Sequence, residues 1–291
     1  MKTKFSVITI GTFDGVHKGH QKLIKETIKS AKKKGFESIA VALEKPVKNI
    51  NSILSLPDEK IKQIEYLEPD KIVLIPVPSE ILSETSTDFL RNFIIKRLKA
   101  KEIICGADFA FGKDRKGNVA WLKNNAKEFG LKIKVVSPVK IDSKIVSSSY
   151  IRTLITKGKI EKVNKLLGRN FGFYGMPFRE KGLGKKLGFP TINLKTDKSK
   201  LLPKGIFISL IEKGSKLYPA ITNMGVRPTI NADNNLVPEV HILNFKGVWG
   251  KSKTQVYLIK KIRAEKKFPS LEALKKQIKK DKEKAKRYFK I

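Results

Sequence analysis

The sequence predicts an α/β domain with a doubly wound parallel sheet, followed by an antiparallel β-barrel that ends in a helix. In the first half, short apolar runs alternate with amphipathic stretches, which is the pattern of βαβ units. After Leu167, strand-like runs follow one another with turn residues between them, which is typical of a barrel. A chain of 291 residues with 40% apolar residues is long enough for two such domains. We expect their boundaries at 1–167 and 168–291.

In the first half, short apolar runs predict strands. Stretches whose apolar residues recur at helical spacing predict helices. Within 21–34, for example, Leu23, Ile24, Ile28 and Ala31 fall on one helical face. In chain order we expect a strand at 5–10, a helix at 21–34, strands at 39–43 and 71–77, a helix at 87–98, a strand at 102–105, a helix at 120–129 and a strand at 131–136.

The second half opens with a glycine-rich stretch and then changes to strands separated by turns such as Lys213-Gly214 and Lys246-Gly247. It closes with an amphipathic helix over 270–289, for which Ser270 is the expected N-cap. The predicted barrel strands lie at 207–211, 217–222, 237–245 and 254–262.

Composition excludes several classes of protein. No apolar run reaches the ~18 residues of a membrane span, and the N-terminus lacks the apolar core of a signal peptide. Cys105 is the single cysteine, which suits a reducing compartment, so we expect a cytoplasmic protein with no membrane partner.

The net charge of +35 is the most unusual bulk property. Its lysines are spread over nearly every segment and are densest on helical patterns. This distribution favours solvated faces and a polyanionic ligand such as ATP over dedicated nucleic-acid binding. We therefore expect no nucleic-acid partner.

A glycine-rich decamer with two histidines lies between the first predicted strand and the first predicted helix. Ligands of a doubly wound sheet bind at this position, where glycines let the backbone approach a phosphate. His17 and His20, three residues apart, can both point at one phosphate chain, whereas a metal site would need further ligands. The predicted phosphate-binding residues of this turn are Gly11, Thr12, Phe13, Asp14 and Gly15.

A second glycine-rich run contains Gly182, Gly184 and Lys185 but lacks the spacing of a Walker A loop. By itself it favours phosphate binding only weakly over a flexible turn. Shortly after it, Thr191 and Asn193 offer two oxygen ligands on one side of an extended segment. Oxygen atoms are the ligands that Mg²⁺ prefers.

Four motifs in order along the chain resemble those of the bacterial bifunctional riboflavin kinase/FAD synthetase family. The decamer GTFDGVHKGH is similar to the HxGH motif of nucleotidyltransferases in the longer form of this family. The other three matching segments are Gly106–Gly112 (GADFAFG), Val146–Arg152 (VSSSYIR) and Gly188–Asn193 (GFPTIN).

The resemblance implies that the first domain joins FMN to the AMP part of ATP and releases pyrophosphate. His17, His20 and Arg152 are then the expected catalytic residues, and Ser148 and Ser149 the expected contacts to phosphate at a helix start. Asp108, Phe109 and Phe111 follow a predicted strand, and we weigh stacking on the flavin ring against core packing for the two aromatic residues.

The resemblance implies that the second domain phosphorylates riboflavin with ATP. Glu239 is the expected base or orienting carboxylate for the riboflavin hydroxyl, and it shares one strand face with His241, which we interpret as a structural histidine. Thr191 and Asn193 are assigned to Mg²⁺ bound with ATP, and Gly182, Gly184 and Lys185 to its phosphates. Arg263 and Phe268 are assigned to the flavin pocket.

Two departures from the family pattern remain. Ser149 stands where threonine is usual, which keeps the hydroxyl. The segment Leu43–Val47 stands where the family has F-E-P-H-P, so a histidine is missing. The missing histidine leaves open an enzyme with an active kinase domain and a weakened adenylyltransferase domain. A second alternative, of a different class, is a basic nucleic-acid-binding protein on the nucleotidyltransferase scaffold.

Overall fold

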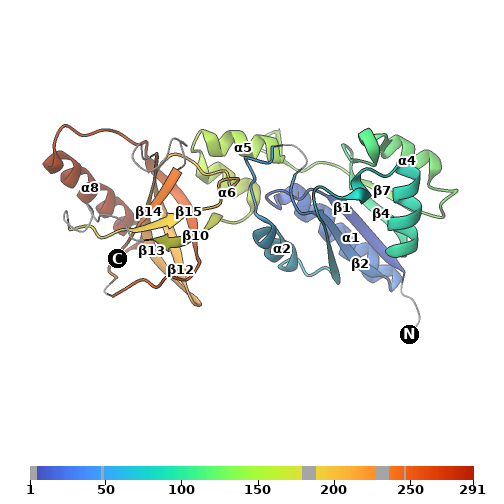
Figure 1. Ribbon diagram of the computed structural model, residues 1–291, viewed down its shortest axis with the longest axis horizontal. Helices are drawn as coiled ribbons and strands as arrows, with labels where there is room; N and C mark the ends of the chain where they lie inside the picture. The colour runs from blue at the N-terminus through green and yellow to red at the C-terminus, as the bar shows by residue number, and fades with distance from the viewer. Residues whose placement is uncertain (1–4, 47–48, 179–187, 227–235, 246) are drawn as a thin grey trace. The chain divides into compact units, whose positions relative to one another are not determined.

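The computed structural model describes the chain except for residues 1–4, 47–48, 179–187, 227–235 and 246. The chain divides into two compact units, Met1–Ser148 and Ser149–Ile291, each with its own sheet (Figure 1). In the described part of the chain, no helix is both long enough and apolar enough to cross a membrane.

The first unit contains a parallel sheet, as predicted. Within its described residues, five strands are ordered β3-β2-β1-β4-β7. Strand β1 pairs in parallel with both β2 and β4, so the order of connections reverses between β1 and β4. The strands are β1 (Ser6–Gly11), β2 (Glu37–Leu43), β3 (Lys71–Ile75), β4 (Ala100–Gly106) and β7 (Lys132–Val136).

Helices cover both faces of this sheet because alternate residues of its strands are apolar on both sides. Ile8 and Ile10 pack with residues of η2 and α4, whereas Val7 packs with Ala31 of α1. The helical elements are α1 (Lys18–Lys34), α2 (Pro57–Glu65), η1 (Glu80–Leu82), α3 (Ser86–Asp88), η2 (Phe89–Arg97), η3 (Lys113–Arg115) and α4 (Val119–Asn125). Two small ribbons are formed by β5 (Ala110–Phe111) with β6 (Gly117–Asn118) and by β8 (Lys140–Ile141) with β9 (Lys144–Ile145).

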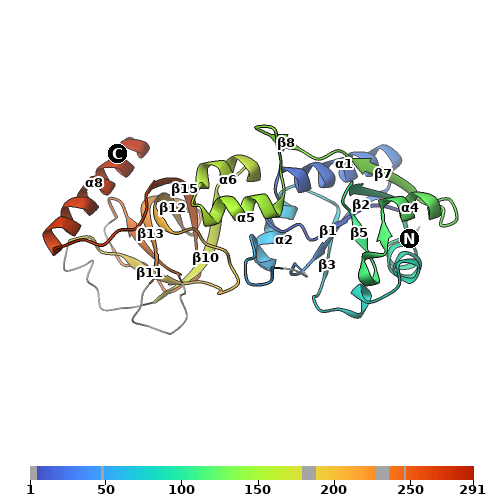
Figure 2. The same cartoon turned by 90° about the horizontal axis from the view of Figure 1, so that it is seen from above.

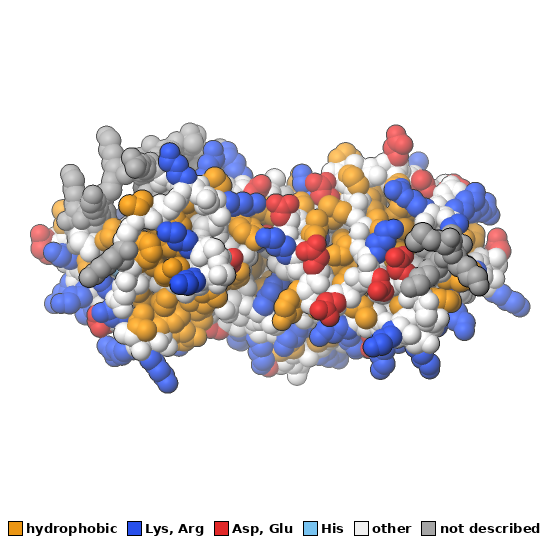
Figure 3. Space-filling model, turned by 90° about the horizontal axis from the view of Figure 1, so that it is seen from below, with side chains coloured by type: hydrophobic (Ala, Val, Ile, Leu, Met, Phe, Trp, Pro, Cys, Tyr) orange, Lys and Arg blue, Asp and Glu red, His pale blue; other side chains and the backbone are white. Residues whose placement is uncertain are grey.

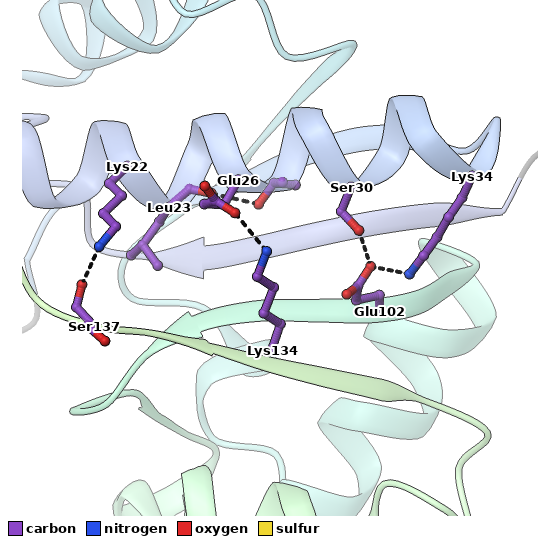
Figure 4. A network of polar contacts seen from close by, with 9 residues as sticks. Lys22, Leu23, Glu26, Ser30, Lys34, Glu102, Lys134 and Ser137 are labelled. Carbon is purple, nitrogen blue, oxygen red and sulfur yellow. Dashed lines mark hydrogen bonds and ion pairs between the residues drawn. The ribbon is translucent and has the colours of Figure 1, made fainter.

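Polar contacts hold α1 against the strands β4 and β7 of the sheet (Figure 4). The carboxylate of Glu102 on β4 accepts hydrogen bonds from Ser30 and Lys34, and it is buried. Glu26 accepts from Lys134 of β7 at 2.7 Å. Because these partners lie far apart in the sequence, they fix the position of the helix whose first turn follows the β1 loop.

The second unit is a closed antiparallel barrel, as predicted. Among the residues that the structure describes, six strands close it in the order β10-β11-β14-β13-β12-β15. Gly175 allows close packing inside the barrel, because a Cβ there would lie 2.7 Å from the Cβ of Leu194. The strands are β10 (Phe171–Phe178), β11 (Ile192–Lys195), β12 (Gly205–Lys213), β13 (Lys216–Val226), β14 (Leu236–Ile242) and β15 (Thr254–Arg263).

Three helices complete the described part of this unit: α5 (Ser148–Thr156), α6 (Ile160–Leu167) and α8 (Leu271–Phe289). Helix α8 begins where predicted, since Ser270 accepts a hydrogen bond from the backbone N–H of Ala273. Ala285 packs with barrel residues such as Ile208, and Asp281 is paired with Arg263 at 2.8 Å, so the helix is fastened to the outside of the barrel (Figure 2).

Sequence patterns missed several elements, among them α2, α6, β10 and β11, and they simplified the helix predicted at 87–98. Helix α2 contains few apolar residues, and β10 and β11 lie in or beside the glycine-rich stretch that shows no regular alternation. The predicted helix at 87–98 is present, but residues 89–97 have π-helical geometry, with the N–H of Leu98 bonded to the carbonyl of Phe93.

The buried thiol of Cys105 gives a test of the first unit. Burial raises its pKa to about 11, so at pH 8 the native protein holds about 100-fold less thiolate than a free cysteine. We expect thiol reagents to label Cys105 at least about 100-fold more slowly in the native protein than in urea. Rapid stoichiometric labelling of the native protein would contradict the placement of β4 in the core.

Candidate functional site

The turn Gly11–His17, which follows β1, has a strained backbone conformation. Phe13 has φ 47°, Gly15 has φ 83° and Val16 has φ 35°. For a β-branched residue such as Val16 this is an outlier, which persists only where surrounding contacts enforce it. Phe13 and Val16 are fully buried beside Ile24 of α1, so their side chains supply part of that enforcement.

The carboxylate of Asp14 fixes the turn from inside the protein. Asp14 is 1% exposed, and its Oδ1 accepts hydrogen bonds from the backbone N–H groups of Leu54 at 2.9 Å and Ser55 at 3.1 Å. Its backbone carbonyl accepts from the hydroxyl of Ser148 at 2.9 Å. These bonds join three distant segments, so the side chains of Asp14 and Ser148 both hold the loop in place.

The two predicted histidines lie together at the start of α1. His17 is the N-cap, and its Nδ1 accepts from the N–H of His20, while the two rings stack with centroids 3.6 Å apart. Gly19 permits this arrangement, because a Cβ there would lie 3.1 Å from Nδ1 of His17. Because Nδ1 accepts this bond, His17 can donate only from Nε2, at the positive end of a 17-residue helix.

The predicted flavin segment follows β4, directly beside the strand that leads into the histidine turn. Asp108 is exposed, Phe109 is half-buried, and Phe111 is buried against Phe89 and Trp121. Phe109 stacks on Phe111 with ring centroids 5.5 Å apart. The crevice at the β1/β4 reversal is where open α/β sheets bind ligands. Phe111 thus supports Phe109, which stays partly exposed just after the carboxyl end of β4.

Ser149 and Arg152 lie one turn apart on α5, in the second unit. Their predicted contacts with ATP phosphates, like that of Ser148, remain predictions.

A buried lysine holds the segment after β2 that differs from the family pattern. Lys60 of α2 is fully buried, and its Nζ donates hydrogen bonds to the carbonyls of Leu43 and Glu44. Burial lowers the pKa of Lys60 to about 8, although the charges of Asp14 and Glu44 act in the opposite direction. Val47 lies outside the described residues. The segment Leu43–Pro46 therefore has a defined anchor in this chain, without the histidine of the family pattern.

The predicted kinase residues meet on the outer face of the barrel. Asn193 of β11 is directly opposite Glu239 of β14 in the antiparallel register, so their side chains share one face. Val240 is buried and faces inward, which turns Glu239 outward, where it is half-buried. Thr191 precedes β11 and is exposed. The structure therefore brings an amide and a carboxylate together and leaves a hydroxyl two residues away.

Other predicted residues of the second unit have different surroundings. Arg263 donates to Asp281 through both Nε and Nη2, and its guanidinium lies 5.7 Å from the ring centroid of Phe268. Both residues hold α8 and the segment before it. Gly182, Gly184 and Lys185 lie outside the described residues.

His241 has a partner of its own on the strand that carries Glu239. Its Nδ1 lies 2.9 Å from the carbonyl oxygen of Pro190, and burial lowers its pKa. Sequence reasoning missed two contacts beside the candidate sites: this bond, and the hydrogen bonds of Lys60. Both contacts join residues that are distant in the sequence, so no local sequence pattern predicts them.

The basic side chains do not gather into one patch on the face drawn in Figure 3. Lysines and arginines are scattered over both units, with acidic side chains between them. On this face the distribution agrees with the expectation that the charge is spread over the surface.

The comparisons with known proteins decide the family. A family model described as FAD synthetase matches residues 1–150, and one described as riboflavin kinase matches residues 167–289. The chain belongs to the bifunctional riboflavin kinase/FMN adenylyltransferase family. It is therefore a transferase with both a kinase and a nucleotidyltransferase domain, which confirms the resemblance seen in the sequence.

Relatives of this bifunctional type match over nearly the full chain. A protein of that description from Buchnera aphidicola subsp. Schizaphis graminum is 35% identical and covers 98% of this chain and 95% of its own length. One from Haemophilus influenzae is 30% identical, with 97% and 94% covered. A crystal structure described as a macrolide-efflux protein from Streptococcus pneumoniae has a TM-score of 0.88 at 27% identity, covering 98% of this chain and 95% of that chain.

The anchor at Lys60 predicts a pH-dependent stability. Because its folded pKa is lowered from 10.5 to about 8, the unfolded chain binds more protons between those values, and stability rises with pH in that window. Relative to Lys60→Met, the wild type should gain about 2 kcal/mol of unfolding free energy between pH 8 and pH 10, and less than about 0.5 kcal/mol between pH 6 and pH 8.

Urea unfolding followed through Trp121 measures this difference, with Trp249→Phe present in both proteins because the chain has two tryptophans. Parallel pH profiles for the two proteins would show that Lys60 is not buried as a charge.

Proposed function

We propose that the first unit transfers the adenylyl group of ATP to FMN in the crevice between β1 and β4, and that the second phosphorylates riboflavin beside Glu239. The functional boundary is proposed at 167/168. The observation that carries the first assignment is the stacked pair His17 and His20 at the start of α1, on the β1 side of that crevice. The pair Asn193 and Glu239 carries the second.

Adenylyl transfer needs positioning more than a strong base, because the attacking FMN phosphate is already anionic near neutral pH. An oxygen of that phosphate bonds to the α-phosphorus of ATP, and the bond from that phosphorus to the bridging oxygen of pyrophosphate breaks. His17 donates from Nε2 and His20 lies against it, so both stabilise charge that grows on the phosphates. Ser149 and Arg152 complete the phosphate contacts, and the exposed part of Phe109 stacks on the flavin.

Phosphorylation of riboflavin needs its terminal hydroxyl to lose a proton as the oxygen attacks the γ-phosphorus of ATP. Glu239 accepts or orients that proton, and ADP leaves. Half-burial on the barrel face suits a carboxylate that must meet both substrate and solvent.

A divalent metal fits the donor atoms beside Glu239. Thr191 and Asn193 present a hydroxyl and an amide oxygen, and Asn193 lies directly opposite the carboxylate, which is an all-oxygen set of the kind that suits Mg²⁺. The ion, bound with ATP, supplies charge neutralisation on the phosphates. The protein side of this arrangement is the pair of oxygen donors two residues apart, Thr191 just before β11 and Asn193 within it.

We also propose that the protein works in the cytoplasm on riboflavin, FMN and ATP. The single buried cysteine supports a reducing compartment, and scattered lysines support small polyanionic ligands over nucleic acid.

Removing both histidines separates the two activities. His17→Ala with His20→Ala should lower FAD formation from supplied FMN by at least about 100-fold, since phosphate-stabilising contacts typically contribute that much. Riboflavin phosphorylation by the same protein should stay within about twofold of the wild type. Chromatography of FMN and FAD measures both. Loss of both activities in a folded double variant would contradict the division of labour.

Glu239→Gln keeps the size of the side chain and removes the base. Riboflavin turnover should fall by about 10²–10⁴-fold, while FAD synthesis from supplied FMN persists. Unchanged riboflavin turnover would make Glu239 a surface residue without a catalytic role. A simultaneous collapse of both activities would instead indicate that β14 no longer folds correctly.

A further inference from the structure

Pairing between β11 and β14 begins at Ile192, so it does not include the proposed metal ligand Thr191, which lies one residue earlier in the chain. Within the described residues, Ile192 pairs with Val240 and Asn193 with Glu239, and no pair precedes Ile192. Pro190 has no backbone N–H, so the chain cannot donate to a ladder at this point. The backbone leading into Thr191 therefore needs another attachment if the hydroxyl of Thr191 is to hold a fixed position.

The side chain of His241 supplies this attachment. If the antiparallel register were continued by one residue, His241 would lie opposite Thr191, and the structure brings its Nδ1 to 2.9 Å from the carbonyl oxygen of Pro190. A carbonyl oxygen only accepts, so Nδ1 carries the proton and donates. The histidine side chain thus holds the Pro190 carbonyl by a hydrogen bond outside the ladder, at a residue that can donate no ladder bond of its own.

Ring contacts hold His241 in the orientation that this bond requires. The ring of Phe189 meets the His241 ring edge-on at 5.9 Å, and Nζ of Lys282 on α8 lies 5.9 Å from the Phe189 centroid. The other nitrogen, Nε2, is buried and has no hydrogen-bond partner among the residues that the structure describes. The bond to Pro190 is therefore the polar contact that sets the ring in this part of the chain.

We propose that His241 is a positioning residue of the kinase site, whose Nδ1–H fixes the Pro190 carbonyl and so places the Thr191 hydroxyl beside Asn193 and Glu239 for Mg²⁺–ATP. This inference rests on the proposed function, in which Thr191 and Asn193 hold the metal. His241 touches neither substrate nor metal and acts through the backbone that it holds. Partners of this kind typically change metal affinity by about 10–100-fold when removed.

Two substitutions of nearly equal size separate the donor from the bulk of the ring. His241→Asn places an amide N–H close to the position of Nδ1, whereas His241→Gln extends its amide toward the position of Nε2. We expect His241→Gln to raise the Mg²⁺ concentration for half-maximal FMN formation by about tenfold, with turnover recovering at saturating Mg²⁺. His241→Asn should recover most of this loss.

The full-length protein supplies its own control, because FAD formation from supplied FMN at saturating Mg²⁺ should be the same in both variants. Thermal unfolding of both variants tests whether the barrel remains intact. Equal Mg²⁺ requirements in the Asn and Gln variants would overturn the inference, since the role would then belong to the shape of the ring.

A reference variant distinguishes this inference from the proposed function. Thr191→Val removes the proposed metal ligand and should raise the Mg²⁺ requirement at least as much as His241→Gln. If Thr191→Val does so and His241→Gln matches the wild type, the inference is wrong and the metal assignment stands. If Thr191→Val leaves the Mg²⁺ requirement unchanged, the metal assignment itself is wrong and the role of His241 is lost with it.

Discussion

The buried carboxylate of Asp14 is the contact on which the adenylyltransferase half depends. It accepts the N–H groups of Leu54 and Ser55, while the carbonyl of the same residue accepts from Ser148. Backbone conformations such as those of Phe13 and Val16 cost about 1–3 kcal/mol each, and these bonds and the burial of both side chains offset that strain. The result is a rigid turn that delivers His17 and His20 to the start of α1, which is what a reaction driven by positioning requires.

The kinase half obtains its precision from strand register. Pairing of β11 with β14 sets Asn193 opposite Glu239 without any special local conformation. Where Pro190 interrupts the ladder, the bond from His241 continues the attachment. Arg263 and Asp281 fasten α8 to the end of β15. One chain thus positions the residues of its two proposed sites by different means, a strained turn in one unit and a barrel ladder in the other.

Much of the fold could be predicted from the sequence, since β1, α1, β2 and the strands β12 to β15 follow clear apolar periodicity. Helix α2 was missed because its residues are mostly charged, although Pro57 at its first position and Glu59 bonded to the N–H of Leu56 are recognisable signals of a helix start. Strand β10 was missed because glycines and a proline obscure its alternation, and its inward side becomes apparent only when Leu194 packs against Gly175.

The sequence predicted which residues form the candidate sites, but it did not predict how their side chains are oriented or which distant residues hold them. Motif spacing places His17 beside His20, yet it gives no sign that the side chain of Asp14 faces inward. For Phe109 and Phe111 it left flavin stacking and core packing both open, and the structure shows that Phe111 is largely core. The roles of Lys60 and His241 depend on partners 16 to 51 residues away, which only the folded chain brings together.

The most direct test of the whole account is a time course of the purified chain with riboflavin, ATP and Mg²⁺, with flavins separated by chromatography. The account predicts that FMN appears first and FAD follows, with one ADP and one pyrophosphate released for each FAD formed. Accumulation of FMN without FAD would contradict the adenylyltransferase assignment, and riboflavin left unchanged would contradict the kinase assignment.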